Sequence, residues 1–367
     1  MKLIKFINEH KNWRELLSNP PYSLKIKDDE GYTLFMYDII NSDFYNPIVK
    51  EARGVIISLR PEPHVVCRAF DKFGNYGEGY ADDIDWASAR VQEKVDGSIV
   101  KLWWDGEWKL SSNSCINAHK ATLDRTGISI GSLFDEAWEK CGANLSVFNP
   151  DYTYIFELVS PYNRVVIKYD ETKLYFIGKR NNKTGEEIIP NKEWDCFEFP
   201  KSYPLSSLEE CVEAAAALNE EEGDVVAEGF VVVDKNFHRV KIKSPIYVAK
   251  HHAVTKNPSL EDLVCIFKRG EKEEFLTYFP AYEEYLNRIE HIFKYLEETL
   301  YFAEKYWKEV NQDKKAFAIK YARIPGSSFL FDAIKFNDWS ISRIKQLPHN
   351  EIARRIKGLV DLVGTKI

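Results

Sequence analysis

The sequence has few of the patterns from which metal-binding or disulfide-rich domains are built. Its six cysteines are far apart, and none belongs to a Cys-x-x-Cys pair or to a neighbouring histidine ligand pattern. Structural zinc sites and disulfide frameworks both use cysteines at close, regular spacings. We therefore expect no zinc site, and thiols that stay reduced, as in a cytoplasm.

Long apolar runs are missing as well. No stretch of about 18 consecutive apolar residues occurs, the length that a membrane-spanning helix needs. The first ten residues contain neither a long apolar core nor a small-residue cleavage site, so they differ from a secretory signal. We expect a cytoplasmic protein with no membrane partner, and we expect a monomer.

Acidic residues outnumber basic ones, but the charges are spread unevenly along the chain. The 367 residues include 50 Lys or Arg and 57 Asp or Glu, which gives a net charge of −7. From residue 314 to residue 367, in contrast, eleven Lys or Arg stand against four Asp or Glu. Nucleic acids bind to local basic patches rather than to the total charge. This segment is therefore either a solvated helix face or a surface that contacts nucleic acid.

The chain is long enough for two domains, and its 44% of hydrophobic residues predict a substantial core. Up to about residue 250, short runs of β-branched and aromatic residues alternate with turn residues, a pattern typical of strands. We expect strands at 32–37, 54–58, 64–70, 152–159, 164–169, 173–179, 225–233 and 237–243, with 164–169 and 173–179 paired. Short helices are expected at 13–17, 117–124, 133–141 and 208–218. Asp105-Gly106 predicts the turn of a hairpin within 103–108. Together these elements predict an antiparallel α+β domain.

The pattern becomes helical between residues 255 and 260. Apolar residues recur at three- and four-residue intervals from Leu286 to Leu300, which predicts one long amphipathic helix. Pro280 lies near its expected start, where proline is tolerated. From residue 314 onward we expect shorter helices, interrupted at Pro325-Gly326 and at Pro348.

One lysine lies between an expected strand and a glycine turn, in Glu93-Lys94-Val95-Asp96-Gly97-Ser98. A lysine at the edge of a buried strand costs free energy unless it is paired or used, because burial disfavours its charged form. Lys-Val-Asp-Gly also fits an ordinary hairpin cap, so the motif alone leaves both interpretations open. Other charged residues interrupt strands in a definite order: Arg53, Lys72, Glu157, Glu228, Lys241 and Lys243. Because Lys241 and Lys243 alternate along one strand, their side chains are predicted to share one face of the sheet.

This ordered set resembles the covalent nucleotidyltransferase superfamily of ATP-dependent polynucleotide ligases and mRNA capping enzymes. Lys94-Val95-Asp96-Gly97 is similar to motif I, Phe156-Glu157 to motif IIIa, Glu228-Gly229 to motif IV and Lys241-Ile242-Lys243 to motif V. A closer resemblance, over residues 30–250, is to the RNA ligase 1 family of the T-even phages. It is carried by Glu51-Ala52-Arg53-Gly54, Asp71-Lys72-Phe73-Gly74-Asn75, Phe156-Glu157-Leu158-Val159-Ser160-Pro161-Tyr162-Asn163-Arg164-Val165-Val166 and Lys241-Ile242-Lys243-Ser244-Pro245-Ile246-Tyr247-Val248.

The resemblance implies an antiparallel-sheet nucleotidyltransferase domain, of the ATP-grasp-like ligase type, over residues 1–254. It implies an all-α domain over residues 255–367, a candidate for binding RNA or tRNA. The implied activity is ATP-dependent RNA ligation: ATP adenylylates a lysine, the AMP passes to an RNA 5′-phosphate, and a 3′-hydroxyl displaces it. The implied partner is RNA with 5′-phosphate and 3′-hydroxyl ends, with nicked tRNA in repair as one candidate, in the host cytoplasm if the protein is viral.

The resemblance also implies roles for single residues. Lys94 is the expected nucleophile, with Lys241 and Lys243 beside it, because nearby cations favour a neutral amine and neutralise phosphates. Glu228 and Glu157 supply oxygen ligands of the kind that Mg²⁺ prefers, with Mn²⁺ as an alternative ion. The residues expected to contact the nucleotide are Tyr37, Arg53, Lys72, Glu93, Phe156, Glu157, Glu228, Lys241 and Lys243. Tyr247 is expected to serve the later steps.

The sequence departs from the family's pattern in one place. Members carry a lysine in the segment after the hairpin that follows motif I, whereas this chain reads Leu110-Ser111-Ser112-Asn113-Ser114-Cys115. Either Lys109 or Lys120 replaces that lysine, or its contact with the phosphates is absent from this protein.

Three other functions stay open. Two belong to the same superfamily: a DNA ligase and a GTP-using mRNA capping guanylyltransferase. The third is a non-catalytic RNA-binding protein that keeps the fold. Intact Lys94, Glu228, Lys241 and Lys243 speak against the third, because binding alone requires no nucleophile.

Overall fold

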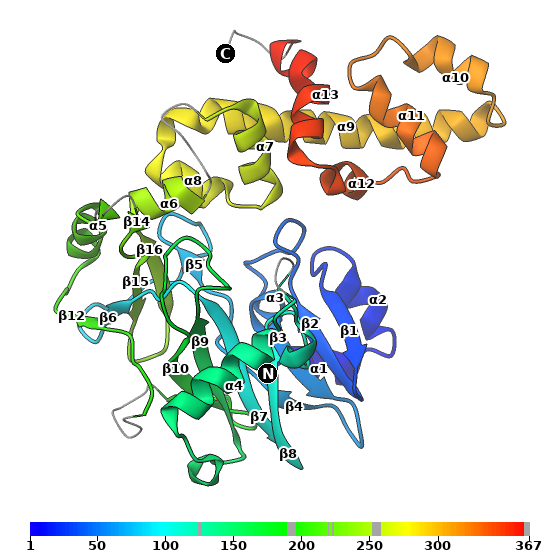
Figure 1. The fold of residues 1–367 in the computed structure, drawn as a ribbon. Coiled ribbons are helices and arrows are strands. Elements are labelled where there is room, and N and C mark those ends of the chain that lie inside the picture. The colour runs from blue at the N-terminus through cyan, green and yellow to red at the C-terminus, as the bar shows by residue number, and fades with distance from the viewer. Residues whose placement is uncertain (124–126, 189–195, 219, 222–223, 252–257, 363–367) are drawn as a thin grey trace. The chain divides into compact units, whose positions relative to one another are not determined.

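The computed structural model divides the chain into two units, Met1–His251 and His252–Ile367 (Figure 1). It describes residues 1–123, 127–188, 196–218, 220–221, 224–251 and 258–362. The predicted boundary between residues 254 and 255 lies outside these described residues. None of the helices within these ranges combines the length and the apolar composition of a membrane-spanning segment.

Three sheets form the first unit, and their strands pair antiparallel except for β16 with β5. The first sheet, in the order β1-β2-β3-β4, comprises β1 (Lys25–Asp29), β2 (Tyr32–Met36), β3 (Arg53–Ser58) and β4 (His64–Cys67). The second, in the order β11-β10-β9-β7-β8, comprises β7 (Ser98–Asp105), β8 (Glu107–Ser112), β9 (Tyr152–Val159), β10 (Lys173–Asn181) and β11 (Glu187–Ile188). The third, in the order β12-β6-β15-β16-β5, comprises β5 (Gly74–Asn75), β6 (Arg90–Glu93), β12 (Ser202–Tyr203), β15 (Gly229–Val233) and β16 (Arg239–Lys243). A separate short ladder joins β13 (Glu220–Glu221) to β14 (Asp224–Val225).

Short helices cover these sheets. They are α1 (Lys2–Glu9), α2 (Trp13–Ser18), α3 (Pro47–Glu51), α4 (Ile130–Cys141), α5 (Leu208–Ala216) and α6 (Pro245–His251), with 3₁₀ turns η1 (Ala118–Lys120) and η2 (Leu145–Val147). Helix α4 begins after Ser129, whose hydroxyl accepts a hydrogen bond from the Ser132 N–H, and ends at Gly142 in the left-handed conformation. Its Leu133 and Phe134 pack in one core with Phe156 of the second sheet.

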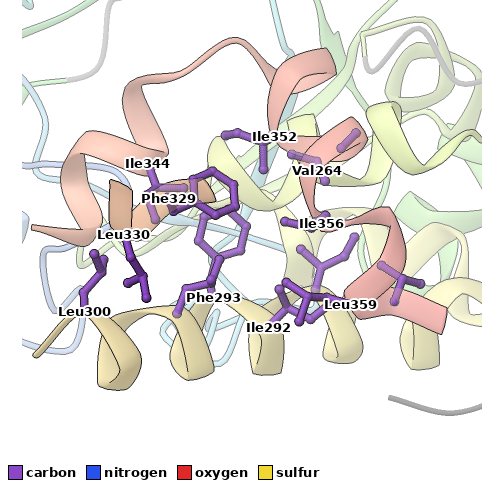
Figure 2. Close-up of a cluster of buried hydrophobic side chains, with 14 of the residues drawn as sticks. Val264, Ile292, Phe293, Leu300, Phe329, Leu330, Ile344, Ile352, Ile356 and Leu359 are labelled. Atoms are coloured by element: carbon purple, nitrogen blue, oxygen red, sulfur yellow. The ribbon is translucent and has the colours of Figure 1, made fainter. Parts of the chain in front are cut away.

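All the secondary structure in the described residues of the second unit is helical. It comprises α7 (Leu260–Lys268), α8 (Lys272–Tyr278), η3 (Pro280–Tyr282), α9 (Glu283–Glu309), α10 (Lys314–Tyr321), α11 (Ser327–Phe336), α12 (Ile341–Gln346) and α13 (His349–Leu362). Figure 2 shows its core, in which side chains of the long helix α9 meet those of α7, α11, α12 and α13. The members labelled there are Val264, Ile292, Phe293, Leu300, Phe329, Leu330, Ile344, Ile352, Ile356 and Leu359.

Locally encoded elements agree with the sequence. The hairpin β7–β8 turns at Gly106, which has the positive φ that the Asp-Gly turn predicted. The long amphipathic helix is α9, with Leu286, Leu296 and Leu300 buried along one face. The predicted helix breaks fall between α10 and α11 and between α12 and α13. These predictions are confirmed.

Two predicted elements are wrong. Residues 117–123 contain only the 3₁₀ turn η1, after which Thr122 bridges to Ser129 in an extended conformation; Asp124 lies outside the described residues. The segment 164–169 is irregular, and β10 pairs with β9 instead. The reason is that the N–H groups of Val166 and Ile167 donate to the carboxylate of Asp96 and not to a strand.

Candidate active site

One cavity in the first unit, about 220 Å³ in volume, lies between strands of the second and third sheets. Its apolar lining is formed by Phe70, Phe73, Val95, Ile99, Ile177, Pro200, Val231 and Val233. Its polar and charged lining is formed by Arg53, Gln92, Glu93, Lys94, Glu157, Arg239, Lys241 and Lys243. An apolar wall facing several cations suits a ligand that combines a flat apolar part with negative charge.

Lys94 follows directly after β6 and stays tied to the third sheet, because its N–H donates to the Gly229 carbonyl at 2.9 Å. Its amine donates to Oε2 of Glu228 at 2.6 Å. The other carboxylate oxygen of Glu228 lies 3.6 Å from the amine of Lys243. Glu228 is almost fully buried. One buried carboxylate therefore faces two lysines that both line the cavity.

Two other residues of the Lys94 motif have structural roles. The buried carboxylate of Asp96 accepts hydrogen bonds from the Val166 and Ile167 N–H groups and, at 2.7 Å, from the Tyr247 hydroxyl. A side chain at Gly97 would collide with the Leu158 carbonyl oxygen. The Tyr247 hydroxyl is thus engaged by Asp96, and Asp96 and Gly97 fix the turn that presents Lys94.

Lys241 and Lys243 occupy alternate positions of β16, and both line the cavity, so their predicted common face is confirmed. Burial holds the pKa of Lys241 well below its usual range, and the charges of Lys72, Lys243 and Arg53 push it in the same direction. The Lys241 amine lies 5.1 Å from the centroid of the Phe73 ring. This concentration of positive charge favours an anionic ligand.

Arg53 and Glu157 bring further charge to the cavity. The guanidinium of Arg53 lies 5.1 Å from the centroid of Phe73, and its buried Nη1 has no hydrogen-bond partner among the described residues. Burial raises the pKa of the Glu157 carboxyl to about 7, and the nearby Lys94 is the main charge that opposes this rise. A buried donor without a partner, beside a cavity, is what an absent anionic ligand would satisfy.

The carboxylates fit a divalent cation that arrives with a phosphate. Within the described part of the chain, no group of three or more His, Cys, Asp and Glu residues gathers to hold a metal by itself. Mg²⁺ is usually held by one or two carboxylates together with substrate phosphates and water. Glu228 and Glu157 supply that number of carboxylates around one cavity.

Three of the predicted nucleotide contacts lie outside this cavity. The buried amine of Lys72 lies 5.2 to 5.6 Å from the ring centroids of Tyr37, Phe44 and Tyr80. Lys72 lines a second cavity that shares Phe73 and Arg239 with the first. Phe156 is fully buried in the core beneath α4. Since Glu157 faces the cavity, strand alternation turns its neighbour Phe156 to the other side of β9.

Sequence reasoning missed several residues of the lining. Arg239 lies two positions before Lys241, so the alternation that linked Lys241 to Lys243 would have found it. Its guanidinium lies 4.1 Å from the Phe70 centroid and pairs with Glu187 at 2.6 Å. Gln92 pairs across the ladder with Val231, and both line the cavity.

A lysine of the neighbouring strand β7 lies opposite the segment 110–115. Lys109 pairs with Glu107 and Lys120 with Asp29, and neither of them lines the cavity near Lys94. Lys101 of β7, in contrast, is the register partner of Ser111 in β8. The fold therefore places neither of the two candidates named from the sequence at this cavity.

Comparison with known proteins agrees with the motifs. A family model described as RNA ligase matches residues 51–247, which is more than half of the chain. The chain belongs to this RNA ligase family. The matched residues include Lys94, Glu157, Glu228, Lys241 and Lys243, so the predicted resemblance to the RNA ligase 1 family is confirmed.

Relatives of this RNA ligase family member include two viral proteins. It is 33% identical, over 71% of its own chain and 39% of the relative, to a protein of Autographa californica nuclear polyhedrosis virus named as a bifunctional polynucleotide kinase/RNA ligase. It is 26% identical to the RNA ligase of Rhodothermus phage RM378, over 62% of this chain and 65% of that one. The chain thus spans less than two thirds of the length of either relative. Among solved structures, an archaeal ATP-dependent RNA ligase matches with a TM-score of 0.44 at 17% identity, covering 72% of this chain and 68% of that chain.

Proposed function

We propose that this protein is an ATP-dependent RNA ligase that joins a 5′-phosphate to a 3′-hydroxyl through a covalent lysyl-AMP. The observation that carries the proposal is the setting of Lys94. Its amine lies at a cavity that combines an apolar wall with Arg53, Lys241 and Lys243, and it is held by the buried Glu228. A nucleotide has the same combination of a flat base and negative phosphates.

In the first step the Lys94 Nζ attacks the α-phosphorus of ATP. A nitrogen–phosphorus bond forms as the bond to pyrophosphate breaks, and the attacking nitrogen loses a proton to solvent. Lys241, Lys243 and Arg53 neutralise the charge that builds on the phosphates, which is the larger part of catalysis in phosphoryl transfer. Glu93, directly before the nucleophile, accepts from the amino group of adenine.

In the second step an oxygen of the RNA 5′-phosphate attacks the same phosphorus, and Lys94 leaves as an amine. In the third step the RNA 3′-hydroxyl attacks the activated 5′-phosphate, and AMP leaves. Glu228 and Glu157 would hold a Mg²⁺ or Mn²⁺ ion, which would supply Lewis-acid polarisation of phosphate oxygens. Lys72, which lines the second cavity, holds phosphates outside the first one, and the Tyr37 ring, 5.6 Å from the Lys72 amine, packs against the nucleotide.

We also propose that the first unit has the ATP-grasp-like architecture of ligases. Two five-stranded sheets bracket the cavity, with β7, β9 and β10 on one side and β6, β15 and β16 on the other. The boundary with the helical domain, placed between residues 254 and 255, belongs to the same proposal.

The identity of the nucleotide that labels the protein distinguishes this proposal from the alternative functions. Incubation with α-labelled ATP and Mg²⁺ is expected to give labelled protein, measured on a denaturing gel, and α-labelled GTP is not. A capping guanylyltransferase would be labelled by GTP instead, and a non-catalytic binder by neither. Sealing assays with single-stranded RNA and with nicked duplex DNA then separate an RNA ligase from a DNA ligase.

The helical unit is proposed to bind the RNA, with nicked tRNA as the candidate substrate. Its last helices contain the basic surplus, and one exposed aromatic ring there lies among cations. Phe336 is 49% exposed, with the Arg343 guanidinium 3.7 Å and the Lys335 amine 5.0 Å from its ring centroid. Aromatic rings beside cations stack on unpaired bases while the cations meet phosphates.

The double variant Phe336→Ala, Lys335→Glu is therefore expected to bind nicked tRNA about tenfold more weakly at low salt, because it loses one stacking platform and one phosphate contact. Binding is measured by fluorescence anisotropy, and lysine labelling should not change. Tyr301→Ala is the matched control, since Tyr301 is 66% exposed but lies one turn after Glu297 and Glu298. Equal losses in both variants, or none in either, would contradict an RNA surface at Phe336.

A further inference from the structure

Lys101, in the middle of β7, is a fully buried lysine that lines neither of the two cavities described above. Burial lowers its pKa, and the positive charge of Arg53 acts in the same direction. A buried amine costs free energy unless its hydrogen bonds serve a purpose. The Lys101 amine donates to the carbonyl oxygen of Gly54.

Gly54 is the extra residue of a β-bulge in β3. The register with β2 passes from Phe35 opposite Val55 to Met36 opposite Arg53, so Gly54 has no partner of its own. Its φ of +71° favours glycine, and a Cβ there would lie 2.9 Å from the Lys101 amine and 2.7 Å from the Asn113 carbonyl oxygen. Lys101 thus reaches from the second sheet to the first and binds the carbonyl that the bulge leaves outside the ladder.

The bulge stands directly beside Arg53. Bulges re-aim the side chains next to them and are frequent near active sites. Here the neighbouring guanidinium lines the cavity over Phe73, with a buried Nη1 that lacks a hydrogen-bond partner among the described residues.

We propose that Lys101 is a positioning residue for Arg53: by holding the Gly54 carbonyl it fixes the bulge that directs the Arg53 guanidinium toward the phosphates of the bound nucleotide. This inference rests on the proposed function, in which Arg53 contacts ATP. Lys101 itself touches no substrate.

The test is a double-mutant cycle on ATP binding, measured by calorimetry with the full chain in a Lys94→Met background, so that binding is separated from chemistry. Arg53→Ala is expected to raise the Kd for ATP by about tenfold, as loss of a charge-assisted contact does. Lys101→Met, which keeps an unbranched side chain but removes its donor, is expected to raise it to a similar extent. The double variant should bind no more weakly than Arg53→Ala alone, because both changes remove the same contact, that between Arg53 and the phosphates. Lys109→Met, a surface lysine of the same hairpin, is the matched control and should bind ATP as the parent does.

The outcomes separate this inference from the function beneath it. If Arg53→Ala leaves ATP binding unchanged, the phosphate role of Arg53 is wrong and the inference fails with it. If Arg53→Ala weakens binding and Lys101→Met does not, or if the two losses multiply in the double variant, only the positioning role is overturned. Lys101→Gln, whose amide stops short of Gly54, serves as a second variant and should repeat the result of Lys101→Met. Failure of both variants to fold would overturn the inference, since Lys101 would then serve the stability of the domain.

Discussion

Lys94→Ala is expected to abolish covalent labelling by α-labelled ATP, with a fall of at least about 10⁴-fold, the size of effect that follows removal of a covalent nucleophile. The reason is that the Lys94 amine, the proposed nucleophile, lines the cavity and donates a hydrogen bond to Glu228 at 2.6 Å. Lys241 and Lys243 line the same cavity, so the variant also asks whether another amine substitutes for it. Labelled protein is quantified on a denaturing gel, and the labelled peptide is identified by mass spectrometry.

Lys109→Ala provides the control for Lys94→Ala. It removes a lysine of the β7–β8 hairpin that pairs with Glu107 outside the cavity, and it should leave labelling unchanged. Thermal melting of both variants checks the fold. We expect Lys94→Ala to stay folded, because the buried Glu228 still has the Lys243 amine 3.6 Å away. A label that persists at the parent's rate in Lys94→Ala would assign the nucleophile to another residue.

Elements were predictable where neighbouring residues determine them. The Asp105-Gly106 turn and the apolar stripe of α9 both depend on residues a few positions apart, and both are present. Residues 164–169 read as a strand by the same rules. The Val166 N–H instead donates a hydrogen bond to Asp96, which lies 70 residues away in the chain. No local sequence pattern predicts such a distant partner.

Much of the site was predictable for a related reason: charged residues on apolar strands are costly and therefore conspicuous. Strand alternation also held information that the sequence interpretation left unused. It makes Phe156 and Glu157 face opposite sides of β9, and it makes Arg239 share the face of Lys241. Lys101 could not be placed, because its partner is a carbonyl exposed by a bulge in a different sheet.

The cations of β16 give the second large effect. Lys241→Met and Lys243→Met are each expected to slow adenylylation by about 10²–10³-fold, the loss typical of removing one group that stabilises charge in the transition state. The two variants should differ in stability. Lys241 lies buried near Lys72, Lys243 and Arg53, whose positive charges outweigh the attraction of Glu78. An apolar side chain there therefore removes net repulsion and should leave the melting temperature equal to or above the parent's. Lys243 faces Glu228, and its loss should lower the melting temperature.

Lys235→Met is the matched control, since this lysine lies in the turn between β15 and β16 and pairs with Asp85 at the surface. It should change neither the rate nor the melting temperature. A rate lost together with stability in Lys241→Met would mean that the lysine holds the sheet together. A lower adenylylation rate with an unchanged or higher melting temperature would mean that Lys241 binds phosphate and does not stabilise the sheet. Because a phosphate ligand would relieve the same repulsion, ATP or inorganic pyrophosphate should raise the melting temperature of the parent more than that of Lys241→Met.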